Sequence, residues 1–382
     1  MAKVVALDDR DTVINNAVVL VRDGRIVELG PASKVTVPDG CRVLDFPEHW
    51  LIPGLVEAHN HQASGGWGDL NDMVYQANPG LDTRSVPQPD AYWNETSRWG
   101  GVTTAIMIPG SGTNISGFGT LVNIGGHTPD EMILRAPGSL KIAQAGNPEW
   151  YFGGNGRMFM NWNTRQTLTK ARDYNAAWER AESDPNAPRP AFDPIWHTFR
   201  DLFQLKIPVT VHTQIYQVVH ATVFMVHGEF GLRTILDHSE FDGWKLGPIV
   251  KDLDIWTVCG PRNYHYDSLG RRFIGYTAAY WAHGVRRIGI NTDSPVLPQN
   301  QLSTQAAINC WFGFLPYPAL KAVTAVPAQA LGAYDERGSV ENGKIADLTI
   351  WTGDPLDPRS ACVLTMTGGE IVYDASQGVR RF

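Results

Sequence analysis

Two histidines, His59 and His61, stand two residues apart in the segment VEAHNHQ, directly after the run LIPGL. Successive side chains on a β-strand alternate between faces, so residues i and i+2 point the same way. At a strand end the two imidazoles would therefore project together, and neutral imidazole nitrogens bind divalent metals well. The pair alone leaves two interpretations open: a metal site, or histidines that satisfy each other or the backbone.

Three further potential ligands also follow apolar segments. His212 ends the segment IPVTVH, His238 ends TILDH, and Asp293 follows RIGINT. If these segments are strands of one β/α barrel, their carboxyl ends meet where the active sites of such barrels form. Unrelated structural uses of four histidines and an aspartate would not favour the same strand end, although Asp293 alone could be a helix N-cap. The sequence therefore predicts a shared metal site.

The other histidines are interpreted differently. His265 and its neighbour Tyr264 lie in GPRNYHYDS, after the seventh expected strand, where a substrate contact and a structural role both stay open. The remaining histidines fall in loops, in expected helices or ahead of the barrel, and are interpreted as structural: His49, His127, His197, His220, His227 and His283.

The middle of the chain alternates short apolar segments with helical patterns. Repeated β/α units of this kind predict a parallel sheet, and an eighth strand near 120–124 would complete a (β/α)8 TIM barrel of the usual length, about 250 residues. A doubly wound open sheet is the alternative, but no GxGxxG follows the first strand. The expected strands are 51–59, 102–108, 139–144, 209–212, 234–238, 255–258 and 287–291, and the expected helices are 167–181, 195–205, 217–230 and 271–283.

Both ends of the chain show β patterns instead. VVLVRDGRIVELG reads as a hairpin turning at Asp23-Gly24, and VLTMTGGEIVYDA as another turning at Gly368-Gly369. The simplest arrangement, which we predict, is a small β-sandwich domain built from residues 1–50 with 343–382, and a barrel domain over 51–342.

Composition limits the class of protein. The chain has 382 residues, a net charge of −7 and 19% charged residues, with no basic block, so nucleic acid is not expected as a partner. No apolar run is long enough for a bilayer, and the start MAKVVALDDRD lacks a secretory h-region. Four scattered cysteines without CxxC spacing fit a reduced, cytoplasmic setting. A homo-oligomer stays open.

Six motifs together are typical of one protein family: LIPGLVEAHNH, GVTTAIMIPGSG, VHT, LDHSE, NTDSP and the tail VPAQALGAYDERGSVENGKIADLTIWTGDPLD. Through these motifs the sequence resembles the amidohydrolase superfamily, in particular its imidazolonepropionase-like branch. The resemblance covers almost the whole chain, and the combination of His-x-His with the tail is specific. It implies a metal-bearing (β/α)8 barrel with a β-sandwich formed by both termini.

The resemblance also assigns roles to residues. His59 and His61 match the family's first-strand metal pair, and His212 and His238 match the two later histidine ligands. Asp293 matches the last-strand aspartate, which binds metal and acts as general base. With a single metal, His238 would instead orient or stabilise the reaction intermediate and so act as a catalytic residue.

The number of metals stays open. Lys141, in SLKIAQAGNP, matches a lysine that is carboxylated in some branches and then bridges two metals. Relatives often read GEN where this chain has AGN, so an acidic ligand is missing at Gly146. Relatives also often carry a second histidine where this chain has Gln214, which is a candidate substrate contact together with Tyr264 and His265.

These residues predict a metal-dependent hydrolase. A divalent ion lowers the pKa of water from about 15.7 towards about 7, and Asp293 would take the proton and return it to the leaving nitrogen. Zinc is the expected ion, although this ligand set also admits iron, manganese or nickel. The expected substrate is a small cyclic amide, an amidine, or an N-acyl or dipeptide-like compound. An ester or lactone hydrolase and a catalytically silent scaffold are the alternatives, and residues 63–93 are a candidate lid.

Overall fold

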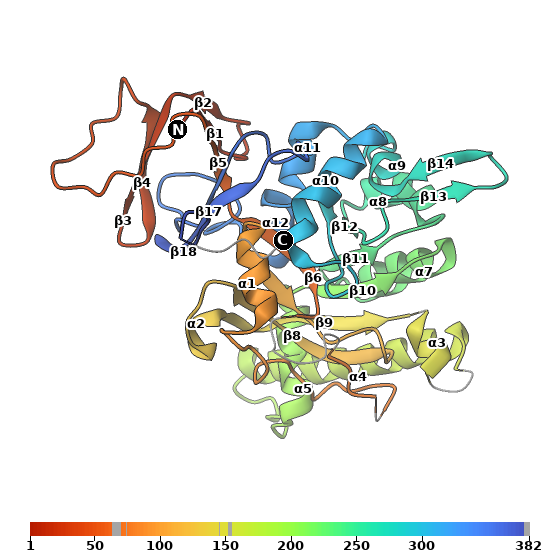
Figure 1. The fold of residues 1–382 in the computed structure, drawn as a ribbon. Coiled ribbons are helices and arrows are strands. Elements are labelled where there is room, and N and C mark those ends of the chain that lie inside the picture. The colour runs from red at the N-terminus through yellow and green to blue at the C-terminus, as the bar shows by residue number, and fades with distance from the viewer. Residues whose placement is uncertain (63–69, 74, 145, 152–154, 378–382) are drawn as a thin grey trace.

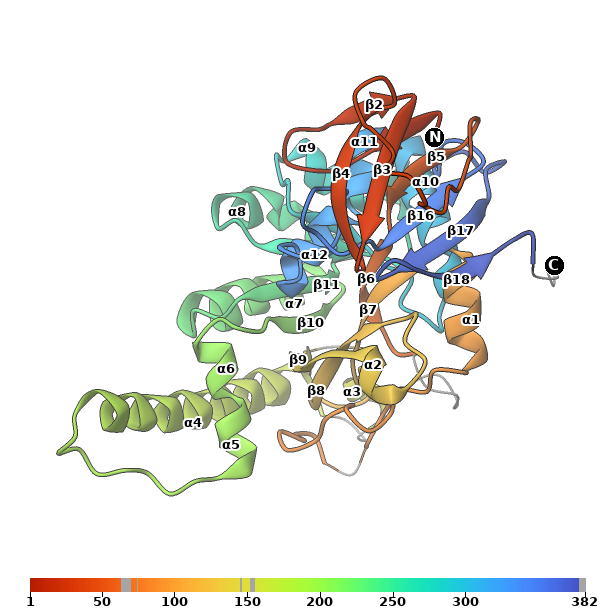
Figure 2. The ribbon, with the colours of Figure 1, turned by 90° about the vertical axis from the view of Figure 1, so that its left-hand side faces the viewer.

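The computed structural model describes residues 1–62, 70–73, 75–144, 146–151 and 155–377 of the chain. Figures 1 and 2 show a barrel-like body of strands and helices with a smaller β-rich part that contains strands from both chain ends. No helix in the described ranges has both the length and the hydrophobicity that crossing a membrane requires.

The barrel-like body is one eight-stranded sheet. Its edges approach each other, because Asn60 forms a bridge with Ser294 and the backbone N–H of His61 donates to the Ser294 carbonyl at 2.9 Å. The sheet is therefore nearly closed, as a barrel requires. In spatial order its strands are β15 (Ile288–Ile290), β12 (Trp256–Cys259), β11 (Thr234–His238), β10 (Val209–Thr213), β9 (Ile133–Ala143), β8 (Ile115–Asn123), β7 (Val102–Met107) and β6 (Leu55–Asn60).

One strand runs against the others. The eighth strand expected near 120–124 exists as β8, but it pairs antiparallel with both β7 and β9. The expectation of a fully parallel (β/α)8 sheet is therefore wrong at this position. A parallel crossover needs a dozen or more residues, and the connection from Met107 to Ile115 is too short for one, so the chain returns as a hairpin.

The first expected strand, 51–59, is in fact two strands. β5 (Trp50–Pro53) belongs to the terminal sheet, and β6 begins at Leu55 in the barrel. Gly54 lies between them, and a Cβ at Gly54 would overlap the side chain of Thr103. The crossing from one sheet to the other thus depends on a residue without a side chain.

The helices fall on the expected segments, but none has the expected extent, and the expected helix 195–205 is two short helices, 194–198 and 200–203. The expected helix 217–230 is a short α-helix followed by a π-helix, η1 (Thr222–Glu229), and 271–283 begins as strand β14 (Arg272–Gly275), paired with β13 (Tyr264–Asp267). The α-helices are α1 (Tyr92–Trp99), α2 (Pro129–Met132), α3 (Asn147–Tyr151), α4 (Arg157–Ser183), α5 (Pro194–Thr198), α6 (Arg200–Phe203), α7 (Tyr216–Ala221), α8 (Gly247–Asp252), α9 (Tyr276–Ala282), α10 (Leu302–Trp311), α11 (Pro316–Lys321) and α12 (Ala325–Leu331).

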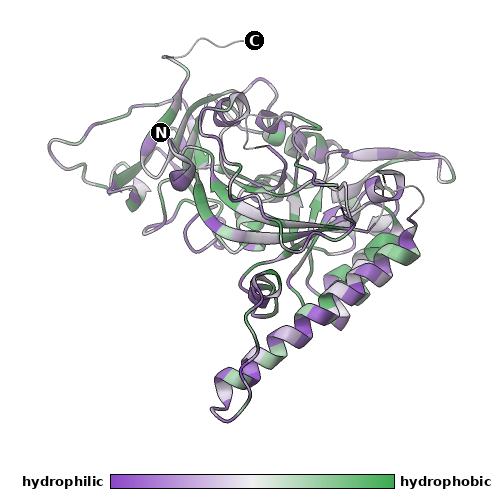
Figure 3. Ribbon diagram, turned by 90° about the horizontal axis from the view of Figure 1, so that it is seen from below, coloured by the Kyte–Doolittle hydropathy of each residue, from purple (hydrophilic) through white to green (hydrophobic). Residues whose placement is uncertain are grey.

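Helix α4 extends beyond the barrel. It has 27 residues, which is longer than the expected 167–181, and Figures 2 and 3 show its far end projecting away from the strands. The segment after it returns through α5 and α6 to β10. Short 3-10 helices, η2 (Gly243–Leu246) and η3 (Gln299–Gln301), complete the connections.

The chain ends form a six-stranded sheet and a two-stranded ribbon. The expected turns are present, because Asp23 and Gly24 have φ of 50° and 76°, and Gly368 and Gly369 have φ of 55° and 82°. One apolar cluster combines Val4, Ile26, Leu51, Leu348 and Leu364 from both ends. The sheet order is β18 (Glu370–Asp374), β17 (Cys362–Thr367), β16 (Leu348–Trp351), β5, β1 (Lys3–Val5) and β2 (Val13–Asn15), and the ribbon is β3 (Ala17–Arg22) with β4 (Arg25–Pro31).

Candidate metal centre

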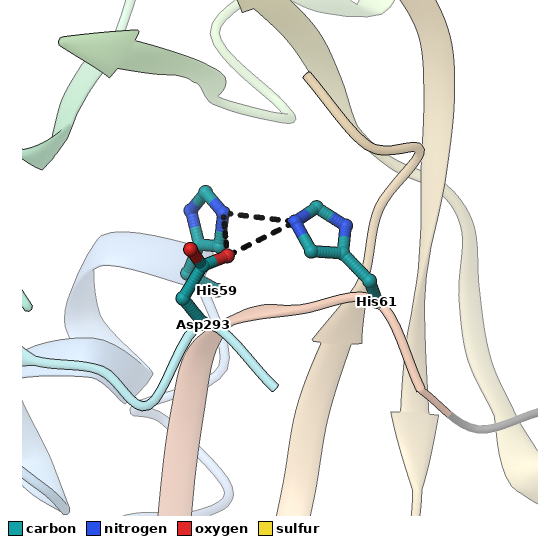
Figure 4. A group of neighbouring side chains, drawn as sticks. All are labelled: His59, His61 and Asp293. Carbon is teal, nitrogen blue, oxygen red and sulfur yellow. Dashed lines mark hydrogen bonds and ion pairs between the residues drawn. The ribbon is translucent and has the colours of Figure 1, made fainter. Parts of the chain in front are cut away.

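Three side chains meet where the edges of the barrel sheet approach each other. His59 and His61 come from the end of β6, and Asp293 follows β15. The two Nε2 atoms are 3.2 Å apart, and Asp293 Oδ1 lies 3.2 Å from each of them (Figure 4). Two nitrogens and one oxygen in such a compact group are a donor set that a divalent metal can use.

In three histidines of this region the ring nitrogen Nδ1 has a hydrogen-bond partner outside the group of His59, His61 and Asp293. Nδ1 of His61 donates to the Ile108 carbonyl at 2.9 Å, and Nδ1 of His238 donates to the Gly260 carbonyl at 2.7 Å. Nδ1 of His212 shares a hydrogen bond of 2.9 Å with the Ser111 hydroxyl. Such partners fix the orientation of a metal-binding imidazole and leave Nε2 for the ion.

His59 is held by a carboxylate instead. Its Nδ1 lies 3.0 Å from Oδ2 of Asp237, and both side chains are fully buried. A carboxylate behind a histidine is a common support for a metal ligand, because it fixes the ring and raises its basicity. The sequence analysis missed Asp237, although an acidic residue inside the apolar strand segment TILDH was a usable signal.

Two buried imidazole nitrogens beside this group have neither a hydrogen-bond nor an ion-pair partner in the described part of the chain. They are Nε2 of His212 and Nε2 of His238. The His238 ring centroid lies 4.4 Å from that of His212 and 4.5 Å from that of His59, so both rings adjoin the central group. Buried polar atoms are almost always paired in native proteins, and a bound metal would satisfy these nitrogens. These residues therefore fit the divalent metal ion that the sequence predicts.

Lys141 reaches the same place from β9. Its side chain is fully buried, and Nζ lies 3.2 Å from Nε2 of His59. A buried ammonium is costly unless it is paired or chemically altered. The structure thus brings the last of the sequence-predicted metal residues to the centre, together with His59, His61, His212, His238 and Asp293.

Burial sets the charge of these groups. It lowers the pKa of His238 to about 3 and the pKa of His212 well below its usual value, so both rings are neutral at pH 7. Burial alone would raise the pKa of Asp293, but His238 and hydrogen bonds from the β6 histidines outweigh it and hold that pKa well below its usual value. Neutral imidazoles and an ionised carboxylate are the protonation states that a metal requires, and His212, His238 and Asp293 meet this requirement. At His59, burial and Lys141 lower the pKa, but Asp237 and Asp293 outweigh them and raise it, so a bound metal would displace a proton from this ring.

The backbone is unusual at the centre. His238, Ser239 and Asp293 have φ of 65°, 51° and 50°, a left-handed conformation that residues with a side chain rarely adopt. Such conformations cost of order 1–3 kcal/mol each and cluster at functional sites, where the surroundings enforce them. The geometry at these two strand ends is therefore maintained by the rest of the fold.

Gln214 and Gly146 adjoin the centre. A Cβ at Gly146 would lie 3.4 Å from both Gln214 Oε1 and His212 Nε2, so all three meet. Gly146 has a φ of 76°, which a glutamate would adopt only with strain. Position 146, where the acidic ligand of relatives is missing, thus has a backbone conformation that favours glycine. Ala145, the other changed residue of this motif, lies outside the described residues.

Tyr264 and His265 lie on the β13–β14 hairpin rather than in an irregular loop. The Tyr264 ring packs 4.8 Å from Phe312, and the His265 ring stacks 5.4 Å from Tyr276, centroid to centroid. These contacts join neither residue to the metal group, so their substrate-binding role stays a prediction.

The expected lid falls partly on residues 63–69 and 74, which lie outside the described residues. The described remainder packs on the loop and strand that follow β7. Asn71 Oδ1 accepts from the Gly112 N–H at 2.7 Å, and the Asn78 N–H donates to Ile115 at 2.8 Å. This part of 63–93 covers the start of β8, and a lid role stays a prediction.

Two further buried carboxylates were missed in the sequence analysis. Glu57 accepts hydrogen bonds from the backbone and hydroxyl of Thr292, which join β6 to the segment carrying Asp293. Burial raises the pKa of Glu57 to about 8. Glu240, two residues after His238, pairs with Arg262 at 2.9 Å. Both depend on contacts between distant segments, which no local pattern indicates.

Known proteins resemble this chain in sequence and in fold. The model of the amidohydrolase family matches residues 316–373. Imidazolonepropionase of Pseudomonas putida is 24% identical over 370 residues, covering 90% of this chain and 89% of that protein. The crystal structure of an amidohydrolase from Thermotoga maritima MSB8 is 26% identical, with a TM-score of 0.83 over 93% of this chain and 94% of that one. A Xaa-Pro dipeptidase with bound methionine shares the fold at 14% identity and a TM-score of 0.62, over 97% of this chain and 98% of that one.

Proposed function

Because this chain belongs to the amidohydrolase superfamily and resembles its imidazolonepropionase-like branch, we propose that it is a metal-dependent enzyme that hydrolyses a carbon–nitrogen bond in a small molecule. The proposed substrates are a cyclic amide, an amidine, or an N-acyl or dipeptide-like compound. The observation that carries the proposal is the compact donor set of His59, His61 and Asp293, with the unpartnered nitrogens of His212 and His238 beside it.

The proposed metal is zinc. His59, His61 and Asp293 would hold one ion, together with His212. His238, and Lys141 if it is carboxylated, would hold a second. Mixed nitrogen and oxygen donors suit zinc, and a catalytic zinc with three protein ligands keeps a position for substrate or water.

The proposed mechanism gives this chain's residues separate tasks. A bound divalent ion supplies Lewis acidity, which lowers the pKa of water and polarises the scissile carbonyl or C=N carbon. Asp293, ionised before reaction, accepts the proton of the attacking water and later delivers it to the leaving nitrogen. With a single metal, His238, held by the Gly260 carbonyl through its Nδ1–H, directs the lone pair of Nε2 at the reacting centre. There it orients the substrate or water as a hydrogen-bond acceptor, and it stabilises developing negative charge only after taking up a proton.

The terminal strands are proposed to form a composite β-sandwich domain, residues 1–50 with 343–382, beside a catalytic domain over 51–342. The shared apolar cluster of both chain ends supports this division. Strand β5 supports extending the first segment to Pro53, since its partners β1 and β16 are terminal strands.

The function is tested by coupling metal analysis to a substrate screen. We expect purified protein to contain zinc or another divalent ion, and to lose turnover on chelation and recover it on adding zinc. The screen compares N-acyl amino acids, dipeptides, hydantoins and imidazolones with lactones and esters. Turnover of lactones or esters alone would replace the proposed bond class, and a protein without metal or turnover would indicate a silent scaffold.

Lys141 decides how many metals are expected. If its amine is carboxylated, the added anionic oxygens would help to hold a second ion, and we expect about two metals per chain in the presence of bicarbonate. Lys141→Met should then contain about one. The measurement is metal stoichiometry by elemental analysis, with and without bicarbonate. A single metal in both proteins, insensitive to bicarbonate, would contradict the two-metal site.

A further inference from the structure

We propose that Arg262 forms a binding site for a carboxylate of the substrate, next to the metal centre. The inference rests on the proposed function and narrows its substrate class to amides that carry a free carboxylate, such as N-acyl amino acids and dipeptide-like compounds. Its basis is a guanidinium that Glu240, two residues after His238, holds in place and that keeps exposed donors.

The position of Arg262 follows from two connections to the centre. The Gly260 carbonyl accepts a hydrogen bond of 2.7 Å from Nδ1 of His238. Because a chain spans at most about 3.6 Å per residue, the Arg262 Cα lies within about 7 Å of that of Gly260. From the other side, Arg262 contacts Glu240, which is two residues after His238. Both connections lie at the carboxyl ends of neighbouring strands β11 and β12, the end of the barrel that carries the metal group.

Glu240 fixes the arginine. Its carboxylate is fully buried and accepts from both the backbone N–H of Arg262 at 3.1 Å and its Nη1 at 2.9 Å. The guanidinium carbon also lies 5.7 Å from the centre of the Phe241 ring. A buried carboxylate that holds both the backbone and the side chain of one residue limits that side chain's freedom, so little entropy is lost when a ligand binds.

The guanidinium keeps donors for a ligand. The Arg262 side chain is 59% exposed, and Nη1 is the only one of its nitrogens with a hydrogen-bond partner in the described ranges. A guanidinium has five N–H donors in a planar fork that matches a carboxylate. The chain carries a net charge of −7, which disfavours the approach of an anionic substrate, and a local cation such as Arg262 offsets this repulsion.

The proposal is tested with Arg262→Met, which removes the charge and keeps an unbranched side chain. Arg165→Met is the matched control, because Arg165 is a similarly exposed arginine paired at 3.0 Å with a glutamate, Glu229. The binding probes are proline, leucine and phenylalanine against prolinol, leucinol and phenylalaninol, which lack the carboxylate. Neither series contains an amide to hydrolyse, so affinity for the metal-loaded protein can be measured by calorimetry without turnover.

We expect at least one amino acid to bind the wild type more tightly than its alcohol. Arg262→Met should weaken that amino acid roughly 10- to 100-fold and change the alcohol little, as expected for a lost hydrogen bond to a charged group. Arg165→Met should retain the preference. For N-acyl amino acids that are turned over, kcat/KM relative to the matching carboxamide should fall by a similar factor in Arg262→Met.

Two binding results would overturn the assignment. One is a wild type that binds no amino acid better than its alcohol, and the other is an Arg262→Met protein that keeps the preference. Equal turnover of acids and carboxamides by the wild type would also reject it, while leaving the hydrolase function intact. Absence of turnover with a retained, Arg262-dependent binding preference would instead reject the hydrolase function alone.

Discussion

Replacing both His59 and His61 by alanine is expected to remove most of the bound metal and to abolish hydrolysis. Their Nε2 atoms supply two of the three donors in the compact group, and only Asp293 would be left at its centre. The loss of metal should also lower the Tm, because an ion that binds only the folded state stabilises it by about 2.7 kcal/mol at a hundred times its Kd. Elemental analysis, turnover and thermal melts measure the three effects.

The control removes two imidazoles elsewhere. His127→Ala with His220→Ala changes two exposed histidines, one of which contacts Glu370 on the terminal sheet. This protein should keep its metal and its activity. If the His59 and His61 double variant held metal at the wild-type level, the metal site would have to lie elsewhere in the chain.

Asp293→Asn is expected to fold and keep part of its metal, yet to lose roughly 10²- to 10⁴-fold in kcat. The amide oxygen can still act as a weak ligand, but asparagine cannot accept a proton. The loss should persist at saturating metal, because it concerns proton transfer and not metal affinity. Circular dichroism and metal titration, followed by kcat at saturating metal, separate these effects.

Asp237→Asn is the matched comparison. Asp237 is also a buried carboxylate that lies 3.0 Å from a histidine nitrogen, but it faces Nδ1 of His59 from behind. Removing such a support typically costs 10- to 100-fold in metal affinity, and kcat should recover when metal is added in excess. An Asp293→Asn enzyme that likewise recovered with excess metal would exclude Asp293 as the general base.

The positions of the barrel strands along the chain could be predicted, but the direction in which β8 runs through the sheet could not. Apolar runs bounded by turns indicated the segments that became β6 to β12 and β15, whereas an apolar run does not show which way it points. The connection of a few residues between Met107 and Ile115 contained that information, since no parallel crossover fits in it. The division of the expected strand 51–59 at Gly54 could not be predicted, because β5 and β6 are both apolar and nearly continuous in the sequence.

The metal group was predictable for a related reason. His59 and His61 share a face by local periodicity, and the parallel strands bring His212, His238 and Asp293 to the same end. The acidic residue in TILDH was visible in the sequence, but the partners of Asp237, Ser111 and the Glu240–Arg262 pair depend on which side chains face each other across the nearly closed barrel. That follows from tertiary packing, so spacing along the chain could not reveal it.

The reversal of β8 has a consequence for how this barrel can vary in length. Because β8 runs against its neighbours, the loop before it lies at the rim that carries the candidate metal ligands, where Pro109 to Asn114 are buried and Ser111 contacts His212. The loop after it lies at the opposite end, where residues 127–130 are exposed. Insertions are tolerated where the backbone is exposed. In evolution or in engineering, extra segments or whole inserted domains therefore belong at 127–130, away from the chemistry, while the 109–114 connection has to keep its length.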